Sequence, residues 1–190
     1  MKNLSVRNSK NSRSGLHELC RVLKDAIPYD TSKMIEIGSF SGDSARIFSE
    51  YFNTVICVDP WRSNYDPTGV DKASDPTLYN MIEVEAEFDK LLQEKENIVK
   101  YKESSQLAAN TTLRDFIVDF VYIDSLHTYE GVRDDIQLWK GKIDKGGFIG
   151  GHDYTSRHFP RVKQAVQEIT NGDIMTFPDS SWLVRISDVK

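Results

Sequence analysis

The stretch that decides the fold starts at a short apolar run and reads Met34-Ile35-Glu36-Ile37-Gly38-Ser39-Phe40-Ser41-Gly42-Asp43. The run that ends at Ile37 is typical of a strand, and the two glycines mark a turn in which backbone can approach a ligand closely. A helical pattern follows, with apolar residues on one face at Ala45, Ile47, Phe48, Tyr51 and Phe52. We therefore predict a strand, a glycine turn and a helix, which is the building unit of an α/β sheet.

The spacing of the two glycines limits the class of ligand that this turn can bind. A dinucleotide-binding turn has three glycines as G-x-G-x-x-G, and the middle one admits the pyrophosphate. Here Gly38 and Gly42 flank three residues with side chains, so a diphosphate would meet Phe40. The phosphate-binding pattern G-x-x-x-x-G-K-[ST] is also missing from the sequence. The turn thus favours a ligand without a polyphosphate, although a nicotinamide-dependent oxidoreductase stays open as an alternative.

Further apolar runs follow this unit and alternate with helical patterns. They cover residues 54–58, 98–101, 117–123 and 147–150, and their lack of polar alternation is typical of strands covered on both faces. Two later runs, 173–177 and 182–186, are separated by four residues and predict an antiparallel hairpin. The predicted fold is a single α/β, Rossmann-like sheet of seven strands, five parallel plus the C-terminal hairpin, with helices on both faces.

The segments around this sheet suggest a simple domain plan. Residues 1–15 carry four basic residues and no acid, so we predict a flexible basic leader followed by one domain over residues 16–190. An amphipathic helix from Leu16 to Ile27 is predicted to precede the first strand. Residues 60–96 exceed the length of a simple crossover and predict a lid-like insertion, which ends in a helix with an apolar stripe at Leu78, Met81, Ile82, Phe88, Leu91 and Leu92.

Composition excludes several classes of protein. The 190 residues include 24 Lys and Arg against 29 Asp and Glu, a net charge of −5, so there is no broad surface to neutralise nucleic-acid phosphates. No apolar run reaches the roughly 20 residues of a membrane span, and the leader lacks the apolar stretch of a secretory signal. We expect a cytoplasmic protein without a nucleic-acid or membrane partner, in which Cys20 and Cys57 are buried thiols.

A second signal supports the glycine turn. Asp59 ends the next strand, 21 residues after Gly38, where a carboxylate can accept hydrogen bonds from both hydroxyls of a ribose. At this point the chain resembles the class I S-adenosylmethionine-dependent methyltransferases, whose sheet has the predicted strands. The resemblance implies that S-adenosylmethionine is the cofactor, that Asp59 binds its ribose, and that its methionine part lies against Glu36, Gly38, Ser39, Phe40 and Gly42.

The resemblance also implies where the adenine lies. Family members bind the base after the third and fourth strands, which corresponds here to Ser104, Ser105 and Asp124. Trp61 could stack over the base, because an indole face suits adenine, or could pack inside the lid.

The second half of the chain resembles a bacterial subgroup that acts on small molecules. The matching features are the strand-ending Asp124, a nearby His127-Thr128-Tyr129, a glycine pair and Asp153, and the resemblance covers residues 33–185. Catechol-type relatives hold a divalent metal on acids at the positions of Asp124 and Asp153, which makes Mg²⁺ a possible cofactor. Their third ligand is an amide, whereas this chain has Tyr154, so His127 or His152 would have to compensate and the metal stays open.

A hydroxyl acceptor needs a base, and the histidines near these acids are the candidates. His127 is our first choice because an unperturbed imidazole titrates near neutral pH, His152 is the second, and Asp153 lies beside them. His127 could instead cap the following helix. Asp134 and Asp135 are read as acids that favour the helix dipole.

The resulting prediction is a methyltransferase that moves the methyl group of S-adenosylmethionine to an oxygen of a small molecule, such as a sugar or a natural-product precursor. Besides the nicotinamide-dependent oxidoreductase, the open alternative is a non-catalytic module that binds a nucleoside.

Overall fold

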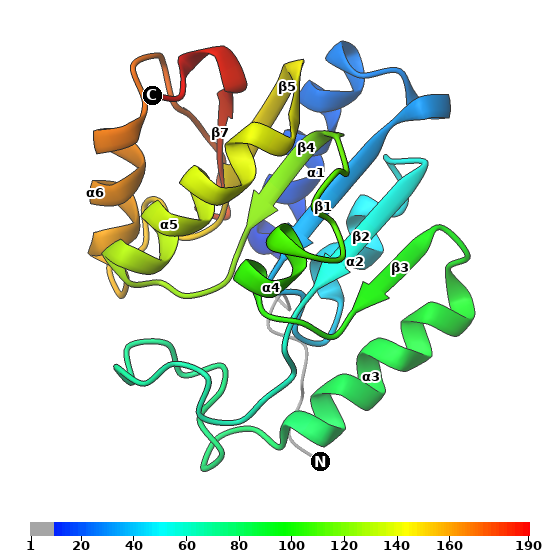
Figure 1. The fold of residues 1–190 in the computed structure, drawn as a ribbon, viewed down its shortest axis with the longest axis vertical. Helices are drawn as coiled ribbons and strands as arrows, with labels where there is room; N and C mark the ends of the chain where they lie inside the picture. The colour runs from blue at the N-terminus through cyan, green and yellow to red at the C-terminus, as the bar shows by residue number, and fades with distance from the viewer. Residues whose placement is uncertain (1–9) are drawn as a thin grey trace.

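The computed structural model describes residues 10–190 and contains one mixed sheet (Figure 1). Its strands lie in the order β3-β2-β1-β4-β5-β7-β6. Five strands are parallel, and β7 runs antiparallel to both β5 and β6. The predicted fold class and the C-terminal hairpin are therefore confirmed. The strands are β1 Lys33–Ile37, β2 Thr54–Val58, β3 Ile98–Tyr101, β4 Val118–Ile123, β5 Ile143–Gly151, β6 Met175–Thr176 and β7 Trp182–Arg185.

Helices cover both faces of this sheet (Figure 1). One core cluster joins the sheet to α1, α2 and α3, and a second joins the opposite face to α4, α5 and α6. These helices are α1 Lys10–Ala26, α2 Asp43–Phe48, α3 Met81–Glu94, α4 Ser105–Asn110, α5 Tyr129–Trp139 and α6 Pro160–Ile169. Short 3₁₀ turns occur at Tyr29–Thr31, Lys140–Lys142 and Ile186–Asp188.

Burial on both faces explains the apolar strands. In β1, Met34 packs into the first cluster and Ile35 into the second, because successive side chains of a strand point to opposite faces. Both residues are fully buried. The carboxyl ends of β1, β2 and β4 meet at one edge of the sheet, and this edge positions the site.

The lid and the leader differ from their predicted forms. The predicted insertion consists of an irregular segment, residues 59–80, followed by α3. Asn80 caps α3 by accepting a hydrogen bond from the Ile82 amide, so the helix starts later than its apolar stripe suggested, and Leu78 and Ile82 are exposed. At the N-terminus, α1 begins at Lys10, inside the predicted leader of residues 1–15, and residues 1–9 lie outside the described part.

Two smaller expectations concern the cysteines and the membrane. Cys20 and Cys57 are buried free thiols, as predicted. Among the described residues, no helix combines the length and the apolar character that a membrane crossing requires.

Candidate active site

The turn after β1 brings backbone against the end of β4. Gly38 has a φ of +89°, and a Cβ at this position would overlap the carbonyl oxygen of Asp124. Gly42 also has a φ of +89° and precedes α2. Phe40 lies between them at φ 45°, a strained conformation for a residue with a side chain. The glycines thus allow a close approach that other residues would block.

Asp59 holds this turn together with the start of the lid. Its two carboxylate oxygens accept hydrogen bonds from the backbone amides of Phe40 at 3.0 Å and Trp61 at 2.7 Å. Burial raises the pKa of Asp59, although these amides act in the opposite direction. The turn and the acid that the sequence singled out are therefore in direct contact. The backbone amide of Ser39 also acts on this carboxylate, which has about four acceptor positions in all, so it can still accept from a further donor.

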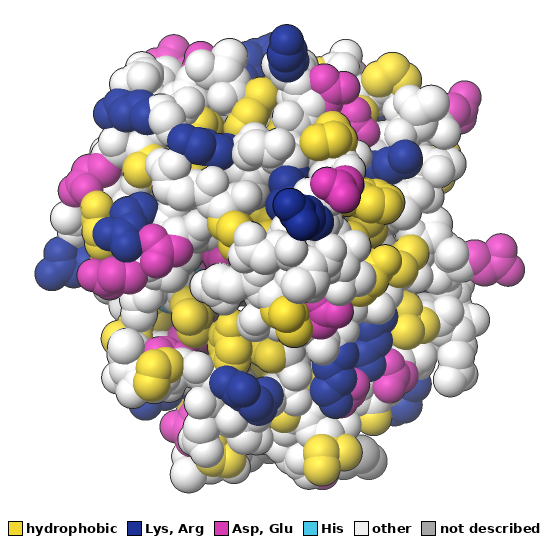
Figure 2. All heavy atoms as spheres, viewed as in Figure 1, with side chains coloured by type: hydrophobic (Ala, Val, Ile, Leu, Met, Phe, Trp, Pro, Cys, Tyr) yellow, Lys and Arg dark blue, Asp and Glu magenta, His cyan; other side chains and the backbone are white. Residues whose placement is uncertain are grey.

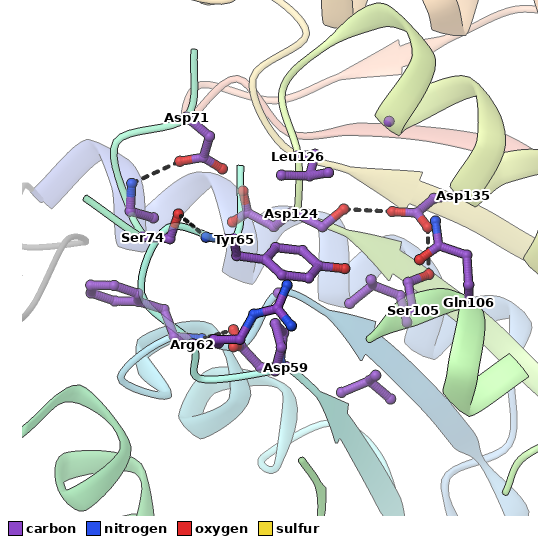
Figure 3. A pocket seen from close by; sticks show the side chains of 18 of the residues that line it. Asp59, Arg62, Tyr65, Asp71, Ser74, Ser105, Gln106, Asp124, Leu126 and Asp135 are labelled. Atoms are coloured by element: carbon purple, nitrogen blue, oxygen red, sulfur yellow. Dashed lines mark hydrogen bonds between the residues drawn. The ribbon is translucent and has the colours of Figure 1, made fainter. Parts of the chain in front are cut away.

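A cavity opens beside this contact, at the carboxyl edge of the sheet (Figure 3). Asp59 and Arg62 lie on one side of it, and Ser105, Gln106 and Asp135 lie on another, with the Tyr65 ring between them. Gly38, Phe40 and Asp124 also line it. We call it the cofactor cavity, because it is lined by residues predicted to form the turn, to bind the ribose and to bind the adenine.

Five predicted cofactor residues do not line this cavity, namely Ser39 and Gly42 in the turn and Glu36, Ser104 and Trp61. Glu36 is buried beneath the turn, where its Oε2 accepts a bond from the Cys57 thiol at 3.6 Å. Ser104 caps α4 through the amide of Leu107. Trp61 is 4% exposed and packs against Phe88, so the expectation that its indole stacks over adenine is not met and the lid-packing alternative holds.

A second cavity adjoins the first and contains the ionisable cluster. Gly38, Phe40, Asp71 and Asp124 line both cavities. His127, His152 and Asp153 line only the second, which we call the acceptor cavity, and so do Ser39, Phe159 and Tyr79. The histidines and acids predicted to lie together are thus brought together.

Three carboxylates surround His127. Its Nε2 lies 2.9 Å from Asp153 Oδ2 and 3.3 Å from Asp124 Oδ1, and its Nδ1 lies 3.1 Å from Asp71 Oδ2. Burial lowers the pKa of His127, but the bonds to Asp124, Asp153 and Asp71 outweigh it and raise the pKa well above its ordinary value. The expectation of an unperturbed imidazole is therefore wrong. The helix-cap alternative is wrong too, because Thr128 caps α5.

Asp153 is held in an unusual backbone conformation. Its φ is 61°, and its Oδ2 lies 3.0 Å from His152 Nδ1 as well as close to His127. Both histidines lower the pKa of Asp153 against the effect of burial. Tyr154, in contrast, packs into the core behind the sheet edge, so its side chain is not available as a ligand.

One set of donors fits a divalent cation. Asp124, His152 and Asp153 offer ligand atoms that all lie within 4.8 Å of one another. Two hard oxygen donors and one imidazole are a chemically reasonable set for such an ion. His152 thus offers a ligand atom at the position that the sequence left open.

Two residues of the site were missed or misread from the sequence. Asp71, in the irregular segment of residues 59–80, reaches His127, and no local pattern predicts where a residue of such a segment lies. Asp135, read as a helix-dipole acid, is 4% exposed and lines the cofactor cavity. Its oxygens accept bonds from the hydroxyls of Ser105 and Ser125, and burial raises its pKa to about 6.

This buried acid predicts a pH dependence of stability. The folded protein holds a proton on Asp135 up to about pH 6, whereas the ordinary value is 3.8. The folded state therefore binds more protons than the unfolded state in this window, and stability falls as the pH rises through it, by about 3 kcal/mol in all. Between about pH 4 and 6, the Tm of Asp135→Asn should rise relative to the Tm of the wild type. A Tm difference that does not change with pH would contradict the assignment.

Comparison with known proteins agrees with this arrangement. A family of methyltransferase domains matches residues 35–154, more than half of the chain. The chain belongs to this family, and it is a class I S-adenosylmethionine-dependent methyltransferase, so the resemblance seen in the sequence is confirmed. The nicotinamide-dependent alternative is set aside. No curated protein sequence matches the chain significantly.

Solved structures share the fold at low sequence identity. The calicheamicin methyltransferase CalS11 has a TM-score of 0.66 at 14% identity, covering 96% of this chain and 80% of its own. The O-methyltransferase TomG from Streptomyces achromogenes, solved with S-adenosylmethionine, has a TM-score of 0.60 at 11% identity, covering 96% and 81%. An rRNA methylase from Streptococcus thermophilus has a TM-score of 0.59 at 11% identity, covering 89% and 93%. The fold alone therefore does not decide the acceptor.

Proposed function

We propose that this methyltransferase acts on an oxygen of a small molecule, such as a sugar or a natural-product precursor. The observation that carries the proposal is that the two cavities adjoin, and that His127 and Asp153 line only the acceptor cavity. The residues that line both cavities are Gly38, Phe40, Asp71, Ala73 and Asp124. Methyl transfer requires that the acceptor oxygen, the methyl carbon and the sulfonium sulfur lie in one line. Two adjoining cavities allow this arrangement, with the cofactor in one and the acceptor in the other. A binding module without activity would have no need of the second cavity and its ionisable groups.

The described residues fit S-adenosylmethionine in the cofactor cavity. The close approach at Gly38 holds the turn against the end of β4, and the Asp59 carboxylate can accept ribose hydroxyls besides its amide donors. Ser39, Phe40 and Gly42 form the turn, and Asp124 joins both cavities. When bound, this cofactor supplies an electrophilic methyl group on a sulfonium.

The residues of the acceptor cavity would handle the acceptor proton. A hydroxyl is a weak nucleophile until its proton is removed, and the His127–Asp153 pair, 2.9 Å apart, faces the cavity where this hydroxyl would lie. Asp124 and Asp71 orient the imidazole from the other directions. We assign the proton transfer to this pair, with His152 supporting Asp153. Nε2 of His127 accepts the proton in the molecules whose imidazole is neutral, so kcat should rise with pH through the raised pKa of His127.

Activity measurements test this assignment. Wild-type protein should transfer a labelled methyl group from S-adenosylmethionine to members of a panel of sugars, nucleotide sugars and phenols. His127→Asn should lower kcat on the best acceptor by about 100-fold and leave cofactor affinity nearly unchanged. His158→Asn, which changes an exposed histidine, is the control. A wild type that binds the cofactor but methylates no hydroxyl, or transfers only to nitrogen or carbon, would contradict the proposal.

We also propose that Asp124, His152 and Asp153 hold a divalent cation. Such an ion would lower the pKa of a hydroxyl next to it. Titration of Mg²⁺ into protein saturated with S-adenosylhomocysteine should raise Tm, because a ligand of the native state stabilises it. Asp153→Asn should abolish the rise and Asp144→Asn, at the far end of β5, should keep it. An equal rise in all three proteins would contradict the site.

A nucleic-acid acceptor is disfavoured by charge. The chain carries −5 overall, and the acceptor cavity is lined by Asp43, Asp71, Asp124, Asp153 and Asp179 against Lys72 and the two histidines. On the face seen in Figure 2, basic and acidic side chains are interspersed. Phosphate backbones bind to continuous basic surfaces instead. Methylation of rRNA or DNA in the same assay would overturn this part.

A further inference from the structure

The buried carboxylate at the far end of the cofactor cavity has no part in the chemistry described above. Asp135 belongs to α5, yet it lies beside Ser105 and Gln106, which follow β3 (Figure 3). Ser105 donates to one of its oxygens, and Ser125, which follows β4, donates to the other at 2.5 Å. Asp135 therefore links the two loops that end β3 and β4.

The surroundings of Asp135 form an ordered chain of hydrogen bonds. Trp139 Nε1 donates to Ser105 Oγ at 2.8 Å, and Ser105 then donates to Asp135. Each hydroxyl is thus committed as a donor toward the carboxylate, so the direction of every bond is fixed. The carboxylate remains an acceptor only and keeps a lone pair on each oxygen.

Packing alone gives a weak reason for this acid. Burying a carboxylate costs free energy, and two serine donors leave its pKa raised. A neutral side chain could join the same two loops at a lower cost. A buried ionisable group that lines a ligand cavity is instead a common feature of binding sites.

The position of Asp135 selects the chemistry of its partner. Asp59 and Asp135 lie on different sides of the cavity, with the Tyr65 ring between them (Figure 3), so a ligand whose ribose meets Asp59 would extend its base along this ring toward Asp135. A carboxylate accepts hydrogen bonds, which suits the exocyclic amino group of a 6-aminopurine. The 6-oxo group of hypoxanthine would instead bring one acceptor against another.

Resting on the proposed cofactor site, we propose that Asp135, held by Ser105 and Ser125, is the residue that selects an adenine over a 6-oxopurine. The acid that reads the base then comes from α5. Glu103, the acid after β3, is engaged by Thr112 at 2.7 Å and does not line the cavity.

Binding of two nucleosides tests the proposal. Calorimetry would compare S-adenosylhomocysteine with its deaminated analogue, S-inosylhomocysteine. The wild type should bind the adenine compound at least about 30-fold more tightly, since hydrogen-bonding sites reject analogues that leave their groups unpaired. In Asp135→Asn the amide can rotate to donate to a 6-oxo group, so the ratio should fall to within about threefold. Asp134→Asn, on the exposed face of α5, should keep the wild-type ratio.

The ratio separates recognition from a structural role. If Asp135 only holds the loops, Asp135→Asn weakens both ligands equally and the ratio stays, which would overturn the proposal, as would a wild type that does not discriminate. Asp135→Ser is the second variant if Asp135→Asn does not fold, because a hydroxyl can either donate or accept, and its ratio should also fall to within about threefold. A wild type that binds neither compound would contradict the proposed cofactor site itself, and the role of Asp135 with it.

Discussion

Replacing Gly38 by Ala is expected to destabilise the protein by about 4 kcal/mol or more and to abolish cofactor binding. The φ of +89° costs an alanine about 1–2 kcal/mol. The new methyl group would also overlap the backbone carbonyl of Asp124, so the ends of β1 and β4 would have to separate. Thermal unfolding should show a fall in Tm of at least about 10 °C.

Gly69 offers a matched control for this substitution. It also has a positive φ, +67°, but an added Cβ would meet only the end of the Lys72 side chain, at 3.8 Å. Gly69→Ala should therefore cost only the conformational part, about 1–2 kcal/mol. Equal losses in the two variants would show that the close approach at Gly38 has no energetic importance.

Asp59→Asn is expected to weaken binding of S-adenosylhomocysteine by about 1000-fold. Two hydrogen bonds from ribose hydroxyls to a charged acceptor are each worth about 1.5–3 kcal/mol. An amide can accept at one atom only, and its other atom would oppose the amide of Phe40 or Trp61. Calorimetry with the purified variant measures the loss directly.

Asp119→Asn is the control, because Asp119 is another acid whose carboxylate accepts a hydrogen bond from a backbone amide. Asp119 accepts the amide of Lys33 at 2.8 Å, at the start of β1 and thus at the opposite edge of the sheet. This variant should bind the cofactor within about threefold of the wild type. A similar loss in both variants would mean that Asp59 acts through general stability and not through the ribose.

The sheet could be predicted because its signals are local and repeated. Residues 54–58 and 98–101 form strands with the bounds that their apolar runs indicated. The start of α3 was misjudged, because Leu78 and Ile82 continue the apolar spacing while Asn80 sets the cap. Capping competes with periodicity at such ends, and periodicity alone cannot decide between them.

The site was predictable where it depends on strand ends. Asp59, Asp124 and Asp153 follow parallel strands, whose carboxyl ends must meet, so their proximity follows from the topology. Asp71 belongs to a loop without periodicity, and only tertiary structure shows that it reaches His127.

Trp61 and Asp135 show two further limits of the sequence. Trp61 was assigned by ring chemistry, which cannot tell a wall of a cavity from the core behind it. Asp135 did carry a signal, because it lies three residues after Val132 and four before Trp139, both buried on the same face of α5. The helical periodicity therefore indicated that Asp135 faces the interior, but its polar side chain led to the reading as a surface acid.

A crystal structure with S-adenosylhomocysteine tests the central claim most directly. We predict that the ribose hydroxyls lie within hydrogen-bonding distance of Asp59, with the homocysteine chain along the turn from Gly38 to Gly42. Density for the ligand elsewhere, with Asp59 bonded only to the amides of Phe40 and Trp61, would contradict the account.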